Sequence, residues 1–244
     1  MSIWSSVIQG LNAPLEEDDA SLSDSDDDAL HREPWSTEGC VETFINPKAA
    51  RCRTPAEAIT NGSSVLMVEA CATDVSCASL RAAASAAARA PEHEAELATG
   101  KVRLPTRRLA VAGAADGLFR DVLARLRKAV PALLPALFPG GLGDVVFTSN
   151  EPAINVYARG GMFQPHEDGM KLTVLVPLTD GRHASCGGTA FWASTRDRGA
   201  PAAALAPPAG SALVFSGDVR HAALTVEDGE RVVFVASFSP RAVS

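Results

Sequence analysis

The stretch of sequence that decides the fold reads Asn155-Val-Tyr157-Ala-Arg-Gly160-Gly161-Met-Phe-Gln-Pro165-His166-Glu-Asp168. His166 and Asp168 are two positions apart, so both side chains point to the same face if this segment is an extended strand. An H-x-D tripeptide occurs by chance in many proteins, and its meaning depends on the residues around it. The stretch therefore predicts a strand that presents an imidazole and a carboxylate side by side.

A candidate site is completed by two more residues, both of which lie much further along the chain. His221 lies 53 residues after Asp168, so it must arrive from another strand that folds back over the first. Two histidines and one carboxylate are the ligands that hold non-haem Fe(II) and leave adjacent coordination positions open. Arg231, ten residues after His221, can grip a carboxylate with its planar fork. We interpret His166, Asp168 and His221 as metal ligands and Arg231 as an anchor for a dicarboxylic acid.

The segments after Asp168 alternate between apolar runs and polar or glycine-containing turns. Strands are predicted over residues 171–178, 187–192, 207–215 and 231–238, and the last of these alternates as a closing strand should. Together with the stretch 155–168, this order of motifs resembles the 2-oxoglutarate/Fe(II) dioxygenases, most closely their prolyl-4-hydroxylase-like branch. The resemblance covers about residues 145–240.

This resemblance implies a mainly β protein with flanking helices, in which a double-stranded β-helix (a jelly-roll, cupin-like core) is packed by N-terminal helices. It implies Fe(II), 2-oxoglutarate and O₂, with ascorbate as a candidate additional reductant. The chain would oxidise, and in the first place hydroxylate, a small molecule or an amino-acid or peptidyl substrate, and release succinate and CO₂. The implied site residues are His166, Asp168 and His221 for the metal and Arg231, Tyr157 and Asn155 for 2-oxoglutarate.

A parity argument bears on the architecture. A flat hairpin through residues 227–230 would place Val226 opposite Arg231, and His221 and Arg231 would then point to opposite faces. Both can face one pocket if their strands belong to the two sheets of a jelly roll. The spacing therefore favours a double-stranded β-helix over a simple meander.

Other functions stay open at this stage. An alkylation-repair nucleic-acid demethylase shares the Asn-x-Tyr pattern, but its arginine-rich strand is absent from this sequence. A non-catalytic cupin-like module that only binds metal is the second alternative, against which the intact ligand set argues. Prolyl hydroxylases usually have Lys where Arg231 stands, so the substrate and the oxidised position are open, as are desaturation and cyclisation.

Composition divides the chain into a tail and a domain. Residues 1–31 contain eight acidic side chains and no Lys or Arg, whereas the remaining residues carry 22 basic and 21 acidic groups. We predict an acidic, disordered tail over residues 1–38. A single dioxygenase domain is predicted over residues 39–244, with helical support at about 39–143 and the β-helix core at about 144–240.

The segment before the core contains two predicted helices, at residues 78–90 and 116–129, and a short strand at 109–112. A basic cluster, Lys101, Arg103, Arg107 and Arg108, is interpreted as the solvated approach to that strand. The five scattered cysteines indicate reduced thiols in a cytoplasmic protein, with the nucleus left open. We expect no membrane and no nucleic-acid partner, and the sequence gives no oligomeric state.

Overall fold

The fold consists mainly of antiparallel strands, as described by a computed structural model for residues 31–180 and 187–241. In this part of the chain the larger sheet holds β1 (Ser36–Thr37), β2 (Cys40–Phe44), β3 (Ser64–Val68), β4 (Lys101–Pro105), β5 (Val145–Phe147), β6 (Ala153–Tyr157), β8 (Leu172–Pro177), β11 (Ala212–Phe215) and β13 (Arg231–Pro240). The smaller sheet holds β7 (Phe163–His166), β9 (Thr189–Phe191), β10 (Ala203–Leu205) and β12 (His221–Ala223).

The strand order shows how the chain crosses between the two sheets. The larger sheet runs β1-β2-β3-β11-β8-β13-β6-β4, with β5 beside β13, and the smaller sheet runs β10-β9-β12-β7. From β6 to β13, most consecutive strands change sheet, and only β9 and β10 are neighbours in both sequence and space. As a result, β12 and β13 lie in different sheets, as the parity of His221 and Arg231 requires.

Strand β13 explains why the larger sheet is apolar on both faces. Val232, Phe234, Ala236 and Phe238 belong to the core that packs against helices, whereas Val233 and Val235 belong to the core between the sheets. Successive side chains of a strand point to opposite faces, so both faces of this strand are buried. Arg231 and Ser237 share the inward face with Val233 and Val235, and this places polar groups inside the sandwich.

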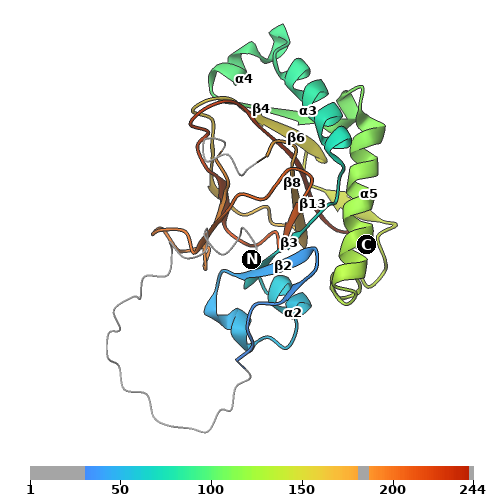
Figure 1. Cartoon of the computed structure of the whole chain (residues 1–244), viewed down its shortest axis with the longest axis vertical. Coiled ribbons are helices and arrows are strands. Elements are labelled where there is room, and N and C mark those ends of the chain that lie inside the picture. The colour runs from blue at the N-terminus through green and yellow to red at the C-terminus, as the bar shows by residue number, and fades with distance from the viewer. Residues whose placement is uncertain (1–30, 181–186, 242–244) are drawn as a thin grey trace.

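The helices cover the outer face of the larger sheet (Figure 1). They are α2 (Pro55–Thr60), α3 (Asp74–Ala88), α4 (Glu94–Ala98), α5 (Ala112–Ala129) and α6 (Leu133–Leu137), with short 3₁₀ turns at Pro47–Arg51, Pro91–His93 and Thr106–Arg108. Both predicted helices are confirmed, but each begins about one turn earlier. In α3 the earlier start follows from Thr73, whose side chain accepts a hydrogen bond from the Ser76 backbone N–H and caps the helix.

The region before residue 144 differs from the predicted helical layer. It contributes β1 to β4 to the larger sheet, because segments such as β3 are buried on both faces and pair with core strands. The strand predicted at residues 109–112 is wrong: a turn and the start of α5 occupy these positions, and the strand lies earlier, at Lys101–Pro105. Val102 and Leu104 of β4 pack under the helices, and this leaves Lys101 and Arg103 on the inner face.

The folded domain also begins before the predicted boundary at residue 39. Arg32 donates two hydrogen bonds to the buried carboxylate of Glu42, at 2.6 and 2.8 Å. The backbone N–H of Trp35 donates to the same carboxylate at 3.0 Å, and β1 pairs with β2. Residues 32–38 are therefore part of the domain, and the disorder predicted for the tail otherwise concerns residues outside the described range.

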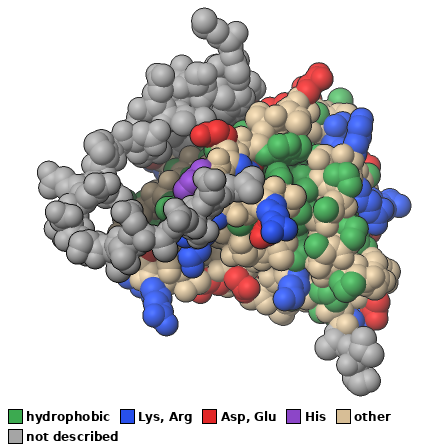
Figure 2. All heavy atoms as spheres, turned by 90° about the horizontal axis from the view of Figure 1, so that it is seen from below, with side chains coloured by type: hydrophobic (Ala, Val, Ile, Leu, Met, Phe, Trp, Pro, Cys, Tyr) green, Lys and Arg blue, Asp and Glu red, His purple; other side chains and the backbone are tan. Residues whose placement is uncertain are grey.

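Three further observations concern the molecule as a whole. Cys40, Cys52, Cys71 and Cys77 are free and buried, and Cys186 lies outside the described residues. None of the described helices combines the length and apolar character needed to cross a bilayer. On the face shown in Figure 2, basic and acidic side chains are interspersed and form no large patch of one sign.

Candidate metal centre

His166 and His221 are brought together by strand pairing in the smaller sheet. They are register partners on the antiparallel strands β7 and β12, and their ring centroids lie 4.4 Å apart. Cross-strand partners have their side chains on the same face, so both imidazoles point into the space between the sheets. The sequence prediction that His221 folds back over His166 is confirmed.

Backbone carbonyls fix the orientation of both rings. Nδ1 of His166 lies 2.9 Å from the Gln164 carbonyl oxygen, and Nδ1 of His221 lies 3.0 Å from that of Val219. A carbonyl can only accept, so each Nδ1 carries the proton and each Nε2 keeps its lone pair. Burial lowers the pKa of His221 and outweighs the opposing effect of Asp168. The lowered pKa also favours the neutral imidazole, which is the form that binds a metal.

Asp168 completes the group from just beyond the end of β7. Its Oδ1 lies 3.3 Å from Nε2 of His166, and its Oδ2 lies 3.7 Å from Nε2 of His221. Its backbone N–H donates to the Gly217 carbonyl at 2.8 Å and not to a strand. A Cβ at Gly217 would lie 2.3 Å from the Met170 carbonyl oxygen, so only glycine permits this close approach.

Hydrogen bonds hold the carboxylate of Asp168 in its charged form. Oδ2 accepts from the Thr173 hydroxyl at 2.6 Å and from the Ser237 hydroxyl at 3.1 Å. Burial alone would raise the pKa of this group, but its contacts with His166, His221 and Thr173 outweigh burial and lower the pKa to about 2. The carboxylate is therefore ionised at neutral pH and can serve as a ligand.

These three residues fit a divalent transition metal. One ligand atom from each of His166, Asp168 and His221 lies within 4.8 Å of the others. Two neutral imidazole nitrogens and one ionised carboxylate oxygen are the donor set of a non-haem iron site with open positions. The carbonyls that bind each Nδ1–H supply the outer contacts that metal-ligating histidines normally have.

A second group of polar residues lies on the opposite sheet. Arg231, at the start of β13, is the register partner of Tyr157 on β6, and its Cζ lies 5.6 Å from the centre of the tyrosine ring. Nη2 of Arg231 donates to the Thr189 hydroxyl at 2.9 Å. Burial raises the pKa of Tyr157, against the lowering effect of Arg231, so the phenol is neutral. Asn155 lies two residues before Tyr157 on the same buried face.

One narrow cavity of about 40 Å³ joins the two groups. Its lining contains all six residues predicted for the site, three further polar residues, and apolar side chains from both sheets. The full set is Arg103, Glu151, Asn155, Tyr157, Phe163, His166, Asp168, Leu175, Thr189, His221, Ala223, Arg231, Val233 and Val235. The predicted ligands and the predicted anchors for the dicarboxylic acid therefore share one cavity.

The cavity also contains residues that the sequence prediction assigned to solvent or did not single out. Arg103 is paired with the buried carboxylate of Glu151, which also accepts a hydrogen bond from the backbone N–H of Ser237. Thr189 lies on a predicted strand, and the sequence alone indicates no role for it. The alternation of polar Lys101 and Arg103 with apolar Val102 and Leu104 is the one sequence signal that could have revealed an inward-facing strand.

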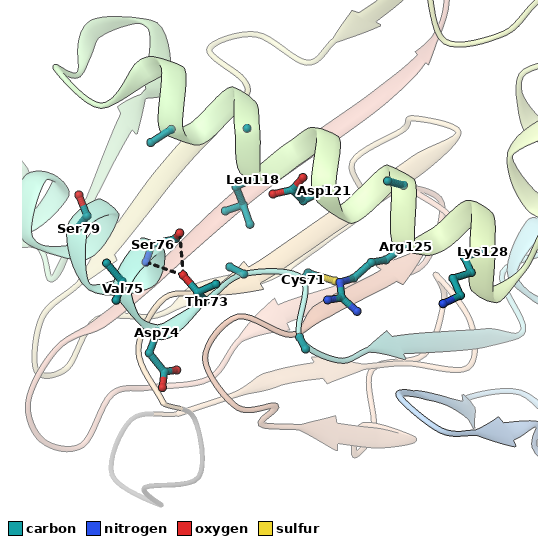
Figure 3. A pocket seen from close by; sticks show the side chains of 15 residues that line it. Cys71, Thr73, Asp74, Val75, Ser76, Ser79, Leu118, Asp121, Arg125 and Lys128 are labelled. Atoms are coloured by element: carbon teal, nitrogen blue, oxygen red, sulfur yellow. Dashed lines mark hydrogen bonds between the residues drawn. The ribbon is translucent and has the colours of Figure 1, made fainter.

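A larger hollow of about 1150 Å³ lies elsewhere, between the start of α3 and α5 (Figure 3). Arg125 and Lys128 project from α5 along one side, while the contact of Thr73 with Ser76 on the other side is the cap of α3. The lining contains no histidine and no group of metal ligands. Chemistry rather than size therefore identifies the narrow cavity as the functional site.

Comparison with known proteins agrees with this geometry. No family profile matches the sequence, and no curated protein is similar to it. The viral collagen prolyl hydroxylase of Paramecium bursaria Chlorella virus-1, in complex with 2-oxoglutarate, is similar in structure with a TM-score of 0.50 and 17% identity, over 76% of this chain and 99% of that one. HygX of Streptomyces hygroscopicus, with nickel, 2-oxoglutarate and hygromycin B bound, is similar with a TM-score of 0.52 and 14% identity, over 76% of this chain and 86% of that one.

A third solved structure extends the range of reactions in this fold. The non-haem α-ketoglutarate-dependent carbocyclase SnoK from nogalamycin biosynthesis is similar with a TM-score of 0.50 and 12% identity, over 78% of this chain and 85% of that one. The chain therefore has the fold of the 2-oxoglutarate/Fe(II) oxygenases. The predicted resemblance, including that to the prolyl-4-hydroxylase-like branch, is confirmed at the level of the fold.

Proposed function

We propose that this protein is a 2-oxoglutarate-dependent non-haem iron dioxygenase with a double-stranded β-helix core. The observation that carries the proposal is the position of the two residue groups in one cavity. His166, Asp168 and His221 present metal ligands from the smaller sheet, and Arg231 faces them from the larger sheet. The crossing of strands β6 to β13 between two sheets is the order expected for the proposed core.

The residues of the cavity divide the work between them. His166, Asp168 and His221 would hold Fe(II), which supplies the activation of O₂ when bound. Arg231, steadied by Thr189, would bind the distal carboxylate of 2-oxoglutarate through its fork. Tyr157 and Asn155 would line the path between the anchor and the metal, and the apolar side chains of Leu175, Val233 and Val235 would keep water out.

The proposed products are succinate, CO₂ and an oxidised organic substrate. We infer a small molecule or an amino-acid or peptidyl substrate, with hydroxylation as the first reaction to test. The solved structures named above act on chemically different molecules, so the fold leaves the substrate to the cavity walls. O₂ is a cosubstrate in this proposal, and ascorbate is a reductant to include in assays.

The experiment that tests the proposal measures binding and turnover together. Purified protein should bind one Fe(II) under anaerobic conditions, should then bind 2-oxoglutarate, and should form succinate when O₂ is admitted. Metal binding without affinity for 2-oxoglutarate would contradict the proposal and would favour the cupin-like module. Turnover that depends on methylated DNA or RNA would instead favour the demethylase.

A further inference from the structure

Among the described residues, the cavity is partly exposed to solvent at an opening between strands β4 and β7. β4 is the last strand of the larger sheet, and β7 is the last strand of the smaller one. The side chains of Arg103 on β4 and His166 on β7 keep 28% and 29% of their surface exposed, whereas that of His221 keeps 6%. In the part of the chain that is described, this opening is therefore the exposed side of the metal site.

Lys101 and Arg103 both face this opening. Lys101 is the register partner of Tyr157, and Arg103 that of Asn155, so their side chains share the cavity face of the larger sheet. Nζ of Lys101 lies 3.2 Å from the centre of the Phe163 ring on β7, and this contact bridges the two sheets. Gly100, the residue before β4, lies directly against Gly161: a Cβ added at Gly161 would lie 2.0 Å from the Gly100 carbonyl oxygen. This close backbone contact fixes the start of β4.

The two cations differ in how their charge is balanced. The guanidinium of Arg103 is paired with Glu151 and makes a long contact of 3.5 Å with Oδ1 of Asn155. Both contacts use its Nη atoms, and the group has five N–H donors, so donors are left for a ligand. Lys101 has no carboxylate partner among the described residues, and burial together with the neighbouring Arg103 lowers its pKa to about 8.

Among the described residues, the charged groups around the cavity sum to one positive charge in excess. Lys101, Arg103 and Arg231 are cations, whereas Asp168 and Glu151 are anions. The two positive charges of Fe(II) and the two negative charges of 2-oxoglutarate cancel when both are bound. A loaded site would then keep a single positive charge on the β4 side, which in a partly desolvated space attracts an anion and disfavours a cation.

We propose that Lys101 and Arg103 bind a carboxylate of the molecule that is oxidised, so that the substrate class is an organic acid with one negative charge near the reacting carbon. The proposal rests on the oxygenase function above and adds the substrate class to it. Arg103 supplies directed donors, held in place by Glu151, and Lys101 supplies the unbalanced charge.

The test reads the environment of Lys101 directly. The chain has only four lysines, at positions 48, 101, 128 and 171, and reductive methylation with ¹³C-formaldehyde labels each amine while keeping its charge. The protein is loaded with Zn(II) in place of Fe(II) and saturated with 2-oxoglutarate, so that the Arg231 site is filled. Acetate, benzoate and N-acetylproline are then titrated against their amides at constant ionic strength. Lys101→Met assigns the resonance.

We expect the Lys101 signal to shift saturably with at least one acid and with no amide, while the other three lysine signals show no saturable shift. Arg103→Gln combined with Glu151→Gln removes the ion pair without leaving a buried charge. This double variant should lower the affinity for the acid at least about tenfold. Arg108→Met, an exposed member of the same basic cluster, is the matched control and should change the affinity less than about twofold.

The outcomes separate the two proposals. Turnover of 2-oxoglutarate without a saturable shift for any acid would overturn the carboxylate subsite and leave the oxygenase standing. Saturable binding of acids at Lys101, without 2-oxoglutarate binding or succinate formation, would support the subsite and overturn the oxygenase. An equal shift with acids and amides would also overturn the subsite, since charge would then play no part in recognition.

Discussion

The hydroxyl of Ser237 lies 3.1 Å from Oδ2 of Asp168 and joins the two sheets at the metal site. Ser237 is on β13 of the larger sheet, whereas Asp168 follows β7 of the smaller sheet. The backbone N–H of the same residue donates to Glu151, which in turn binds Arg103. The orientation of Asp168, a proposed metal ligand, therefore depends on the larger sheet as well as on the smaller one.

Ser237→Ala should weaken metal binding, because Asp168 loses one of the two hydroxyl donors that hold its carboxylate. Loss of such an outer contact typically costs about tenfold or more in metal affinity. Calorimetric titration with Mn(II) or Fe(II) measures the effect. Ser239→Ala, on the same strand but bonded to the Lys171 backbone N–H, is the control, and an equal loss in both variants would contradict a specific role.

Removal of either histidine ligand should abolish metal binding and turnover. His166→Ala and His221→Ala each leave two protein ligands, which hold a divalent ion much more weakly than three. Anaerobic Fe(II) titration and succinate formation are the measurements, and circular dichroism checks the fold. Near-normal activity in either variant would show that the ligand assignment is wrong.

Substitution of Arg231 should weaken the binding of 2-oxoglutarate and leave the affinity for the metal unchanged. Truncation of a buried charged contact typically costs about 2–5 kcal/mol, so Arg231→Met should raise the KM for 2-oxoglutarate by well over tenfold. Arg231→Lys keeps the charge but loses the fork, and should have a smaller effect. Iron affinity is the internal control, since Arg231 is not a ligand. An unchanged dependence on 2-oxoglutarate would count against the dioxygenase.

Arg32→Met should destabilise the domain by about 3 kcal/mol, because the carboxylate of Glu42 is fully buried and would lose its charged partner. Burial opposes ionisation of Glu42, but its bonds with Arg32 and the Trp35 N–H outweigh burial and lower its pKa. The stability that this pair contributes is therefore present above the unfolded pKa of a glutamate and is lost as pH falls through the lower, folded pKa.

Urea unfolding of the wild type at a series of acidic pH values should show that loss. The double variant Arg32→Met with Glu42→Gln should lose less stability over the same range, because it has no ionised group to protonate. A steeper loss in the double variant would contradict the account.

Two truncations should separate the tail from the domain. Deletion of residues 1–30 should leave thermal stability and succinate formation close to those of the full chain, because the segment is acidic and poor in core-forming side chains. Deletion of residues 1–35 also removes Arg32 and Trp35 and should lower the melting temperature by several degrees, about 4 °C or more. Equal stability of the two truncated chains would show that the Arg32–Glu42 contact contributes little.

Local spacing in the sequence was sufficient for a large part of the fold and the site. The separation of His166 and Asp168 by two positions, the distance to His221, and the fork chemistry of Arg231 predict the three candidate ligands and the candidate anchor. The strands β8, β9, β11 and β13 and the helices α3 and α5 are predicted from apolar runs and repeats, whereas β5 and β10 are not predicted. These features depend on near neighbours, and the sequence states them directly.

Only the tertiary structure decided which residues share the cavity. Arg103 lines it, and Lys101 lies on the same face of the sheet, because β4 pairs with β6, a contact between segments about 50 residues apart that no local pattern specifies. Period-two alternation predicts that one face of β4 is polar, but not whether that face meets solvent or a cavity. The same is true of Ser237, since its hydroxyl reaches Asp168 only after two sheets have been stacked and their separation has been set by packing.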